Sequence, residues 1–288
     1  MSRSQAVREH EAQDTDALRF RAACEASESA GAALLHFRGR PLPSREAVGG
    51  QLKMPIDVAA EAWVLGYLAS LFPQDRFLAE EAFESSSRTW DAPPAYWTVD
   101  ALDGTRSFIE GFDGFCVQVA YVEQGEVRFG VVYEPVRAAT YAARKGQGAW
   151  VAAADGQRRS LMLNGVFEPQ RPIVVDSRRP AGAVGALLTR FGGDFLECGS
   201  YGVKICRVAE GSAHLLAKPG PFKLWDVAPG DLILREAGGR LGLWSGEPIV
   251  YDQPQVVFEN LLAATPMLFE MAVVALRGEG RSVERVPQ

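Results

Sequence analysis

The chain has 288 residues, of which 47% are hydrophobic, 23% charged and 10% aromatic, and this composition excludes disordered, collagen-like and low-complexity proteins. Acidic residues outnumber basic ones by 36 to 30, and the net charge of −6 argues against nucleic acid as a partner. No apolar run approaches the ~20 residues that cross a bilayer, so we expect no membrane partner either.

The first half of the chain has the pattern of a helix pair followed by an antiparallel sheet. Apolar residues recur at helical spacing from Asp16 to Phe37, and residues 57–72 form a second expected helix, which Asp57 can cap. Gly125 is typical of a hairpin turn between two strands. Strands are expected, in chain order, over 76–79, 96–102, 116–122, 127–133, 140–143 and 148–151.

The second half alternates strands with helices. Strands are expected over 172–175, 214–218 and 261–264, and helices over 183–191, 199–210, 226–237 and 266–277. A polar, turn-rich segment at 152–168 separates the two patterns. We therefore predict two domains, with residues 1–152 holding the helix pair and antiparallel sheet and residues 153–288 forming an α/β half.

The cysteines and the N-terminus both favour a reducing compartment. The polar first residues, MSRSQAVREHEAQDTD, lack the apolar core of a secretory signal, so we expect a cytoplasmic protein. The four cysteines are far apart and contain no CxxC pair, which argues against a zinc site or a disulfide framework. They are Cys24, Cys116, Cys198 and Cys206.

The segment WTVDALDGT, residues 97–105, combines a hydrophobic strand with two carboxylates. Asp100 and Asp103 are three residues apart, so they can converge on one or two Mg²⁺ ions, with the Leu102 carbonyl as a further oxygen ligand. Gly104 frees the backbone to turn, so that its N–H and that of Thr105 can face an anion. The alternative is an ordinary polar turn, and the full string favours the metal site over that alternative.

Other acidic residues are ambiguous when each is taken alone. Glu80 and Glu81 follow a buried strand, where a divalent cation would offset their repulsion, but an exposed acidic loop is an equal alternative. Asp226 stands where a helix begins, and a simple helix cap explains it well. Asp57 and Glu61 are one turn apart on a helix, where solvated acidic residues are common.

Together these clusters resemble the inositol monophosphatase superfamily of Mg²⁺-dependent, lithium-sensitive phosphomonoesterases. The matching blocks are FLAEE, WTVDALDGTRSF and KLWDVAPGDLILREAGG, and the spacing from Asp57 to Glu80 also suits the family. The likeness runs from about residue 15 to residue 277, and three ordered blocks are far more specific than a single DGT. The resemblance implies a layered αβαβα sandwich, with most metal ligands in the first half of the chain.

The resemblance also implies roles for the matched residues. Glu80, Asp100 and the Leu102 carbonyl would hold a first Mg²⁺, and Asp100, Asp103 and Asp226 a second. Glu80 would also help with a weaker third ion.

The same resemblance assigns the catalytic and phosphate-binding roles. Asp57 and Thr105 would orient and deprotonate the attacking water, with Glu80 as a further catalytic residue through its metal. The N–H groups of Gly104 and Thr105 would hold the phosphate.

The substrate is expected to be a small phosphate ester. Family members that hydrolyse inositol phosphate carry a Glu where this chain has Pro219, whereas the run from Gly199 and Ser200 to Lys204 resembles the bacterial 3'(2'),5'-bisphosphate nucleotidases. Lys204 and the helix start at Gly199 and Ser200 could bind a second phosphate, and a solvated helix lysine is the alternative. We therefore expect hydrolysis of 3'-phosphoadenosine 5'-phosphate. Inositol or sugar phosphate hydrolysis and a catalytically silent phospho-ligand-binding relative are the alternatives, and a homodimer is left open.

Overall fold

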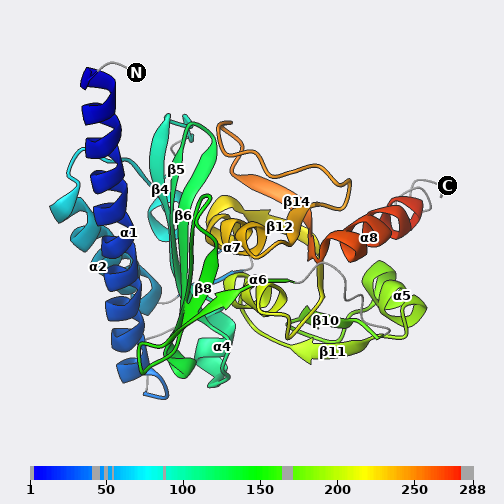
Figure 1. Cartoon of the computed structure of the whole chain (residues 1–288). Helices are drawn as coiled ribbons and strands as arrows, with labels where there is room; N and C mark the ends of the chain where they lie inside the picture. The colour runs from blue at the N-terminus through cyan, green and yellow to red at the C-terminus, as the bar shows by residue number, and fades with distance from the viewer. Residues whose placement is uncertain are drawn as a thin grey trace.

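The computed structural model describes residues 3–40, 46–48, 51–53, 55–86, 89–163 and 171–279. Its elements form layers in which helices alternate with two sheets (Figure 1). From one side to the other these are a helix pair, a seven-stranded sheet, an inner helix pair, a five-stranded sheet and an outer helix pair. The expected αβαβα sandwich is therefore confirmed. Within the described ranges, every helix is too short or too polar to span a bilayer.

The first helix pair packs on the seven-stranded sheet through small apolar side chains. α1 spans Arg3–Phe37 and α2 spans Pro55–Leu71. Ala23, Ala26 and Ala30 recur at intervals of three and four residues on α1 and are almost completely buried. Ala26 and Ala30 are among the residues whose helical spacing predicted this helix, and the observed helix begins earlier than expected.

The seven-stranded sheet contains all the strands expected in the first half of the chain. Its strands are β3 Phe77–Ala79, β4 Ala95–Asp103, β5 Cys116–Glu123, β6 Glu126–Glu134, β7 Ala139–Arg144, β8 Ala149–Ala152 and β9 Arg158–Leu161, in that order across the sheet. β9 was not expected, because it lies in the polar segment 152–168 and three of its four residues are exposed. β3 is parallel to β4, and the other neighbours are antiparallel. Gln124 and Gly125 have φ values of 52° and 75°, which suit the tight hairpin turn between β5 and β6.

The five-stranded sheet is built from the second half of the chain. Its strands are β10 Ile173–Asp176, β11 Asp194–Glu197, β12 Leu215–Lys223, β13 Arg240–Leu243 and β14 Val257–Ala264. The order is β11-β10-β12-β14-β13, and α5 (Gly182–Arg190) and α8 (Pro266–Glu279) cover its outer face. β11 and β13 were not expected because short edge strands carry too few apolar residues to give a clear alternation.

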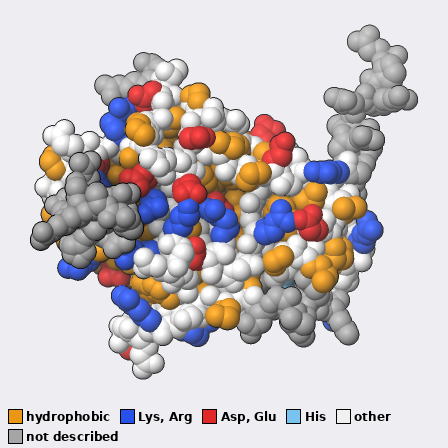
Figure 2. Space-filling view, turned by 45° about the horizontal axis from the view of Figure 1, so that its top comes forward, with side chains coloured by type: hydrophobic (Ala, Val, Ile, Leu, Met, Phe, Trp, Pro, Cys, Tyr) orange, Lys and Arg blue, Asp and Glu red, His pale blue; other side chains and the backbone are white. Residues whose placement is uncertain are grey.

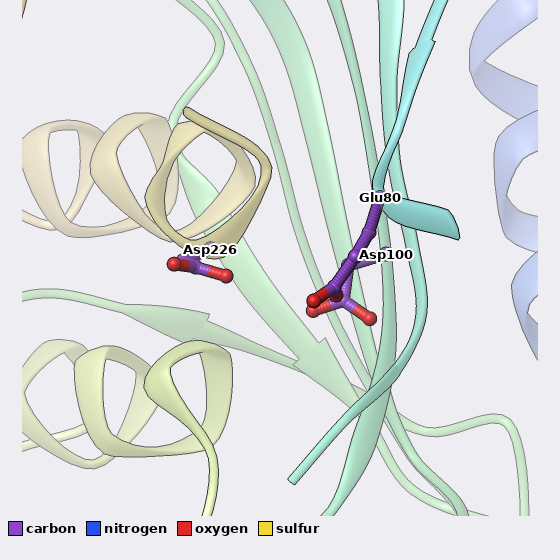
Figure 3. A group of neighbouring side chains, drawn as sticks. All are labelled: Glu80, Asp100 and Asp226. Atoms are coloured by element: carbon purple, nitrogen blue, oxygen red, sulfur yellow. The ribbon is translucent and has the colours of Figure 1, made fainter. Parts of the chain in front are cut away.

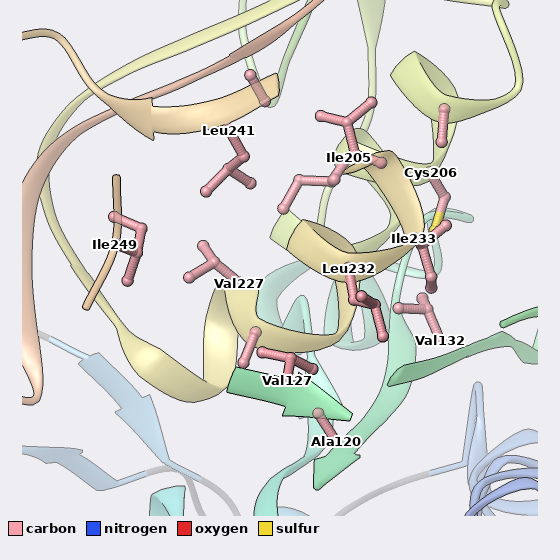
Figure 4. Close-up of a cluster of buried hydrophobic side chains, with 14 of the residues drawn as sticks. Ala120, Val127, Val132, Ile205, Cys206, Val227, Leu232, Ile233, Leu241 and Ile249 are labelled. Atoms are coloured by element: carbon pink, nitrogen blue, oxygen red, sulfur yellow. The ribbon is translucent and has the colours of Figure 1, made fainter. Parts of the chain in front are cut away.

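The inner helices α6 (Tyr201–Ala209) and α7 (Leu224–Glu236) join the two sheets into one core. Val132 of the first sheet, Ile205 of α6 and Ile233 of α7 belong to the same buried cluster (Figure 4). Gly130 of β6 allows close contact, since a Cβ there would lie 2.6 Å from the Pro229 carbonyl oxygen of α7. Because each fully buried aliphatic side chain contributes ~1.5–3 kcal/mol, this core holds both inner helices firmly against β4–β6.

The chain changes from one sheet to the other later than expected. β9 still pairs with β8 in the seven-stranded sheet, and residues 164–170 of the expected boundary lie outside the described residues. The two-domain division at residue 152 therefore stays a prediction. The remaining short elements are β1 Glu46–Val48, β2 Gln51–Lys53, α3 Glu80–Glu84, α4 Thr105–Glu110 and the 3₁₀ helix Pro135–Arg137.

Candidate active site

The parallel pair β3–β4 places two acidic residues side by side. Ala79 pairs with Val99, so Glu80 and Asp100 follow at corresponding positions of the two strands. Asp100 is buried, and its Oδ1 accepts a hydrogen bond of 3.0 Å from the N–H of Leu102. Glu80 is the first residue of α3, so the exposed acidic loop that the sequence left open is not formed here.

A third carboxylate reaches this pair from the inner helix α7. One oxygen each from Glu80, Asp100 and Asp226 lie within 4.8 Å of one another (Figure 3). Asp226 is in the first turn of α7, and its Oδ2 also accepts a hydrogen bond of 2.7 Å from the N–H of Lys223. The helix-cap interpretation is therefore correct in part, since the same carboxylate caps the helix and faces the acidic pair.

Asp103 lies beside this group and is held by α6. Its Oδ2 accepts hydrogen bonds from the N–H of Gly202 at 2.7 Å and from Nε2 of Gln118 at 3.1 Å. The ladder between β4 and β5 shifts register between Asp100 and Asp103, which turns the second carboxylate toward α6. The expected role of Asp103 as a metal ligand stays a prediction, and it would rely on its Oδ1.

The turn after Asp103 has the geometry that the Gly-Thr pair suggested. Gly104 has a φ of 94°, and a Cβ there would lie 3.0 Å from the carbonyl oxygen of Gly114. Thr105 begins α4, and its Oγ1 donates a hydrogen bond of 3.2 Å to the Leu102 carbonyl. Leu102, Gly104 and Thr105 thus line the same pocket as the three carboxylates.

The electrostatics of the cluster call for a cation. Burial, with the repulsion of neighbouring carboxylates, holds the pKa values of Glu80 and Asp100 well above their ordinary range and raises the pKa of Asp226 to about 7. The pKa of Asp103 is also raised by burial. A bound cation would offset the repulsion among these four acidic groups and favour their ionised forms. An all-oxygen, anionic donor set fits a hard divalent cation such as Mg²⁺.

Two adjoining pockets open at the site. The first has a volume of about 380 Å³, and the acidic residues line it together with Thr105, Tyr201 and Lys223. The second has a volume of about 770 Å³ and shares Gly104 and Arg106 with the first. The charged residues lining the second are Arg106, Arg178, Lys218, Glu110, Asp113 and Glu197. On one face of the molecule, basic side chains lie among acidic ones across the middle (Figure 2).

The expected substrate-binding residues contribute to the second pocket in different ways. Gly199 lines it, whereas Ser200 is buried and caps α6, accepting a hydrogen bond of 2.9 Å from the N–H of Val203. Lys204 is only 1% exposed and is not among the residues that line either pocket, so the solvated-lysine alternative is wrong. Its Nζ donates to Oγ of Ser177 at 2.7 Å, and Ser177 does line the second pocket.

Asp57 is a buried residue of α2 and is not among the residues that line either pocket. α2 begins at Pro55, so Asp57 is inside the first turn. It therefore does not cap the helix from outside, which differs from the sequence-based expectation. Glu61, one turn later, accepts hydrogen bonds from the N–H groups of Glu81 and Ala82 at 2.7 and 2.8 Å. Glu61 therefore supports the helix that carries Glu80, and the catalytic role of Asp57 stays a prediction.

Sequence reasoning missed three residues that shape the site. Gln118 and Gly202 hold Asp103, and Lys223 lines the first pocket beside Glu80. A polar residue inside the apolar run of β5 is a signal that could have identified Gln118. The roles of Gly202 and Lys223 depend on how α6 and α3 pack, which has no local sequence pattern.

Comparisons with known proteins agree with this geometry. A family model described as the inositol monophosphatase family matches residues 19–277. The 3'(2'),5'-bisphosphate nucleotidase CysQ of Escherichia coli is 31% identical over 244 residues, covering 82% of this chain and 95% of that protein. The fructose-1,6-bisphosphatase/inositol-1-monophosphatase of Thermotoga maritima is 29% identical over 216 residues, covering 71% of this chain and 76% of that protein.

The fold is also similar to that of a solved protein. The structure of an IMPase from Thermotoga maritima has a TM-score of 0.76 at 22% identity, and the match covers 92% of this chain and 98% of that one. The carboxylate cluster fits the metal dependence of this family. The chain therefore belongs to the inositol monophosphatase family and is a phosphatase-type hydrolase.

Proposed function

We propose that the protein is a Mg²⁺-dependent 3'(2'),5'-bisphosphate nucleotidase that acts on 3'-phosphoadenosine 5'-phosphate. The observation that carries this proposal is the pair of adjoining pockets, one acidic and one larger that is lined by three basic and three acidic residues. A substrate with one phosphate needs only the first pocket, whereas a nucleoside bisphosphate uses both. The similarity to the CysQ nucleotidase over 82% of the chain supports the same assignment.

The first pocket is assigned to the phosphate that is removed. Two Mg²⁺ ions would be held there, one by Glu80, Asp100 and the Leu102 carbonyl, and one by Asp100, Asp103 and Asp226, with Glu80 also serving a weaker third ion. When bound, the ions neutralise the phosphate and lower the pKa of a coordinated water.

The chain itself supplies orientation in this pocket. Thr105 donates its hydroxyl hydrogen to the Leu102 carbonyl, so its Oγ1 can accept a hydrogen bond from the attacking water and orient it. Asp57 would help to orient this water, and its carboxylate would accept the proton that the water releases. The N–H groups of Gly104 and Thr105 lie at the start of α4, where no intrahelical acceptor is available to them, and would bind phosphate oxygens. Positioning and charge neutralisation then account for catalysis without a covalent intermediate on the protein.

The second pocket is assigned to the other phosphate and the nucleoside. Arg178 and Lys218 would pair with the phosphate, and Ser177 would hydrogen-bond to it. Gly199 forms the pocket wall, and Ser200 holds that wall to α6. Lys204 would act through Ser177, whose hydroxyl it contacts from inside the fold.

The test compares kcat/KM for 3'-phosphoadenosine 5'-phosphate and inositol 1-phosphate, with and without Mg²⁺. We expect a preference for the nucleotide of roughly one to three decades. Arg178→Ala removes a charged hydrogen bond and should lower the nucleotide value roughly 10- to 100-fold while sparing inositol 1-phosphate. Arg179→Ala, an exposed neighbour outside the lining residues, is the matched control.

Each contrary result points to one alternative. A preference for inositol 1-phosphate would replace the nucleotidase assignment with inositol or sugar phosphate hydrolysis. Absence of phosphate release from every ester at saturating Mg²⁺ would favour a silent phospho-ligand-binding relative.

A further inference from the structure

Lys223 places a positive charge in the acidic pocket. It is the last residue of β12, it lines the pocket, and its side chain is 17% exposed. Its Nζ forms an ion pair with Glu84 and lies 4.0 Å from Oε1 of Glu80. The ammonium also lies 5.6 Å from the centre of the Trp225 ring, where the ring face attracts a cation.

The position of this ammonium is fixed from two sides. Glu84, its partner, is on α3, the helix that begins with Glu80. The Trp225 ring packs edge-on against Phe83 of the same helix, with ring centres 5.6 Å apart. The contacts that hold α3 against α7 therefore also hold the ammonium beside the carboxylate of Glu80.

Glu80 faces the Lys223 ammonium, and a bound divalent ion would add a second positive charge beside the same carboxylate. One of its oxygens belongs to the group that lies within 4.8 Å of Asp100 and Asp226, and Oε1 lies near the Lys223 ammonium. Two cations beside one carboxylate repel each other, and the repulsion is stronger in a partly buried pocket than in water. Lys223 must therefore oppose a divalent ion at Glu80.

We propose that Lys223 is a built-in counter-cation of the metal site, which offsets Glu80 in the metal-free protein and weakens the binding of divalent ions. This inference rests on the metal site of the proposed function and concerns its Mg²⁺ affinity, whatever the substrate is. The hydrogen bond from Lys223 to Asp226 uses the backbone N–H, so a change of side chain leaves it in place.

The test titrates Mg²⁺ into the metal-free full chain by isothermal calorimetry and measures Tm without metal. Lys223→Met keeps an unbranched side chain that is one heavy atom shorter and removes its charge. We expect Mg²⁺ to bind about tenfold more tightly to this variant. Its metal-free Tm should fall, and the rise in Tm on adding Mg²⁺ should exceed that of the wild type.

Two further variants isolate the charge effect. Lys223→Arg keeps the charge and should retain an Mg²⁺ affinity within about threefold of wild type. Lys145→Met is the matched control, because Lys145 pairs with Glu126 on the surface away from the site and its loss should leave Mg²⁺ binding unchanged. If Lys223→Met does not fold, Lys223→Gln carries the same expectation of tighter binding.

The outcomes separate this inference from the proposed function. A wild-type chain that binds no Mg²⁺ refutes the metal site itself. Mg²⁺ binding to Lys223→Met that equals or falls below wild type overturns the counter-cation alone. Unchanged Mg²⁺ affinity with weaker binding of inorganic phosphate would make Lys223 a phosphate ligand and would likewise overturn the proposal.

Discussion

Adding one methyl group in Gly202→Ala should disrupt the hydrogen bonds that hold the Asp103 carboxylate in place. The Gly202 N–H lies 2.7 Å from Oδ2 of Asp103, and an added Cβ would lie 2.7 Å from Oε1 of Gln118 and 2.9 Å from Sγ of Cys116. Both neighbours are completely buried, so neither can swing into solvent. Gly202→Ala must therefore displace Gln118, which is itself a hydrogen-bond donor to Asp103.

Three terms determine how Gly202→Ala changes the free energy of unfolding, and the first opposes the other two. Alanine is favoured over glycine inside a helix by ~0.5–1 kcal/mol. Overpacking costs ~1–3 kcal/mol, and each weakened hydrogen bond to the Asp103 carboxylate costs ~1.5–3 kcal/mol. We expect a net loss of about 2–4 kcal/mol, which lowers Tm by roughly 5–15 °C for a chain of this size. Displacement of Asp103 should also lower kcat/KM about 100-fold.

Scanning calorimetry and phosphate release measure both effects. Gly66→Ala is the matched control, since Gly66 is inside α2 and an added Cβ there meets nothing within 4 Å. It should keep full activity and gain ~0.5–1 kcal/mol. In a Gln118→Asn background the Gly202→Ala loss should shrink, because the shorter amide leaves room. Wild-type Tm and kcat/KM for Gly202→Ala would refute the idea that α6 holds Asp103.

Three more predictions concern the carboxylates and their ions. Asp100→Asn should lower kcat/KM by more than ~100-fold at saturating Mg²⁺, because an amide cannot supply the negative charge that both ions would share. The metal-free Tm should not fall, because the amide relieves repulsion with Glu80. Near-normal turnover would contradict the shared-ligand role. Millimolar Li⁺ should inhibit phosphate release when Mg²⁺ is limiting, and unaffected rates would count against the family mechanism. The raised pKa values mean that the metal-free fold binds protons more tightly than the unfolded chain. The Tm of the metal-free protein should therefore rise as pH falls from about 8 to about 6, through the pKa of Asp226 at about 7. The increase in Tm on adding Mg²⁺ should be larger at the higher pH. Calorimetry that shows the reverse trend would refute this prediction.

The parts of the site that are local in sequence could be predicted. Asp100, Leu102 and Asp103 belong to one strand and the turn after it, so their clustering depends on a few backbone angles only. Glu80 joins them because a parallel neighbour places strand ends at the same height, and a short strand followed by acidic residues gives that pattern. Asp226 required the family resemblance, since its own surroundings in the sequence favour a simple helix cap.

The parts that depend on distant packing could not be predicted. Whether Ser177 and Arg178 lie near Gly104 is decided by how β10 and α6 pack, and no periodicity encodes that. The same holds for Lys223, whose closeness to Glu80 depends on the contact of α3 with α7. Charged residues at element ends give no signal of their own in a hydrophobic pattern, so their partners become known only from the fold.

Lys204 illustrates how burial changes the meaning of a residue that the sequence had singled out. Nearly every residue of α6 is buried between the two sheets, so its lysine cannot be solvated. The ammonium lies 3.7 Å from Asp176, and burial lowers its pKa while Asp176 raises it. Removing the ammonium would leave the buried negative charge of Asp176 less well compensated, so Lys204→Ala should lower the free energy of unfolding. The same variant should weaken the binding of every substrate. Arg178 is exposed and lines the second pocket, and its removal leaves the buried Lys204–Asp176 pair intact. The loss of Arg178 is therefore the change that can report substrate choice rather than folding.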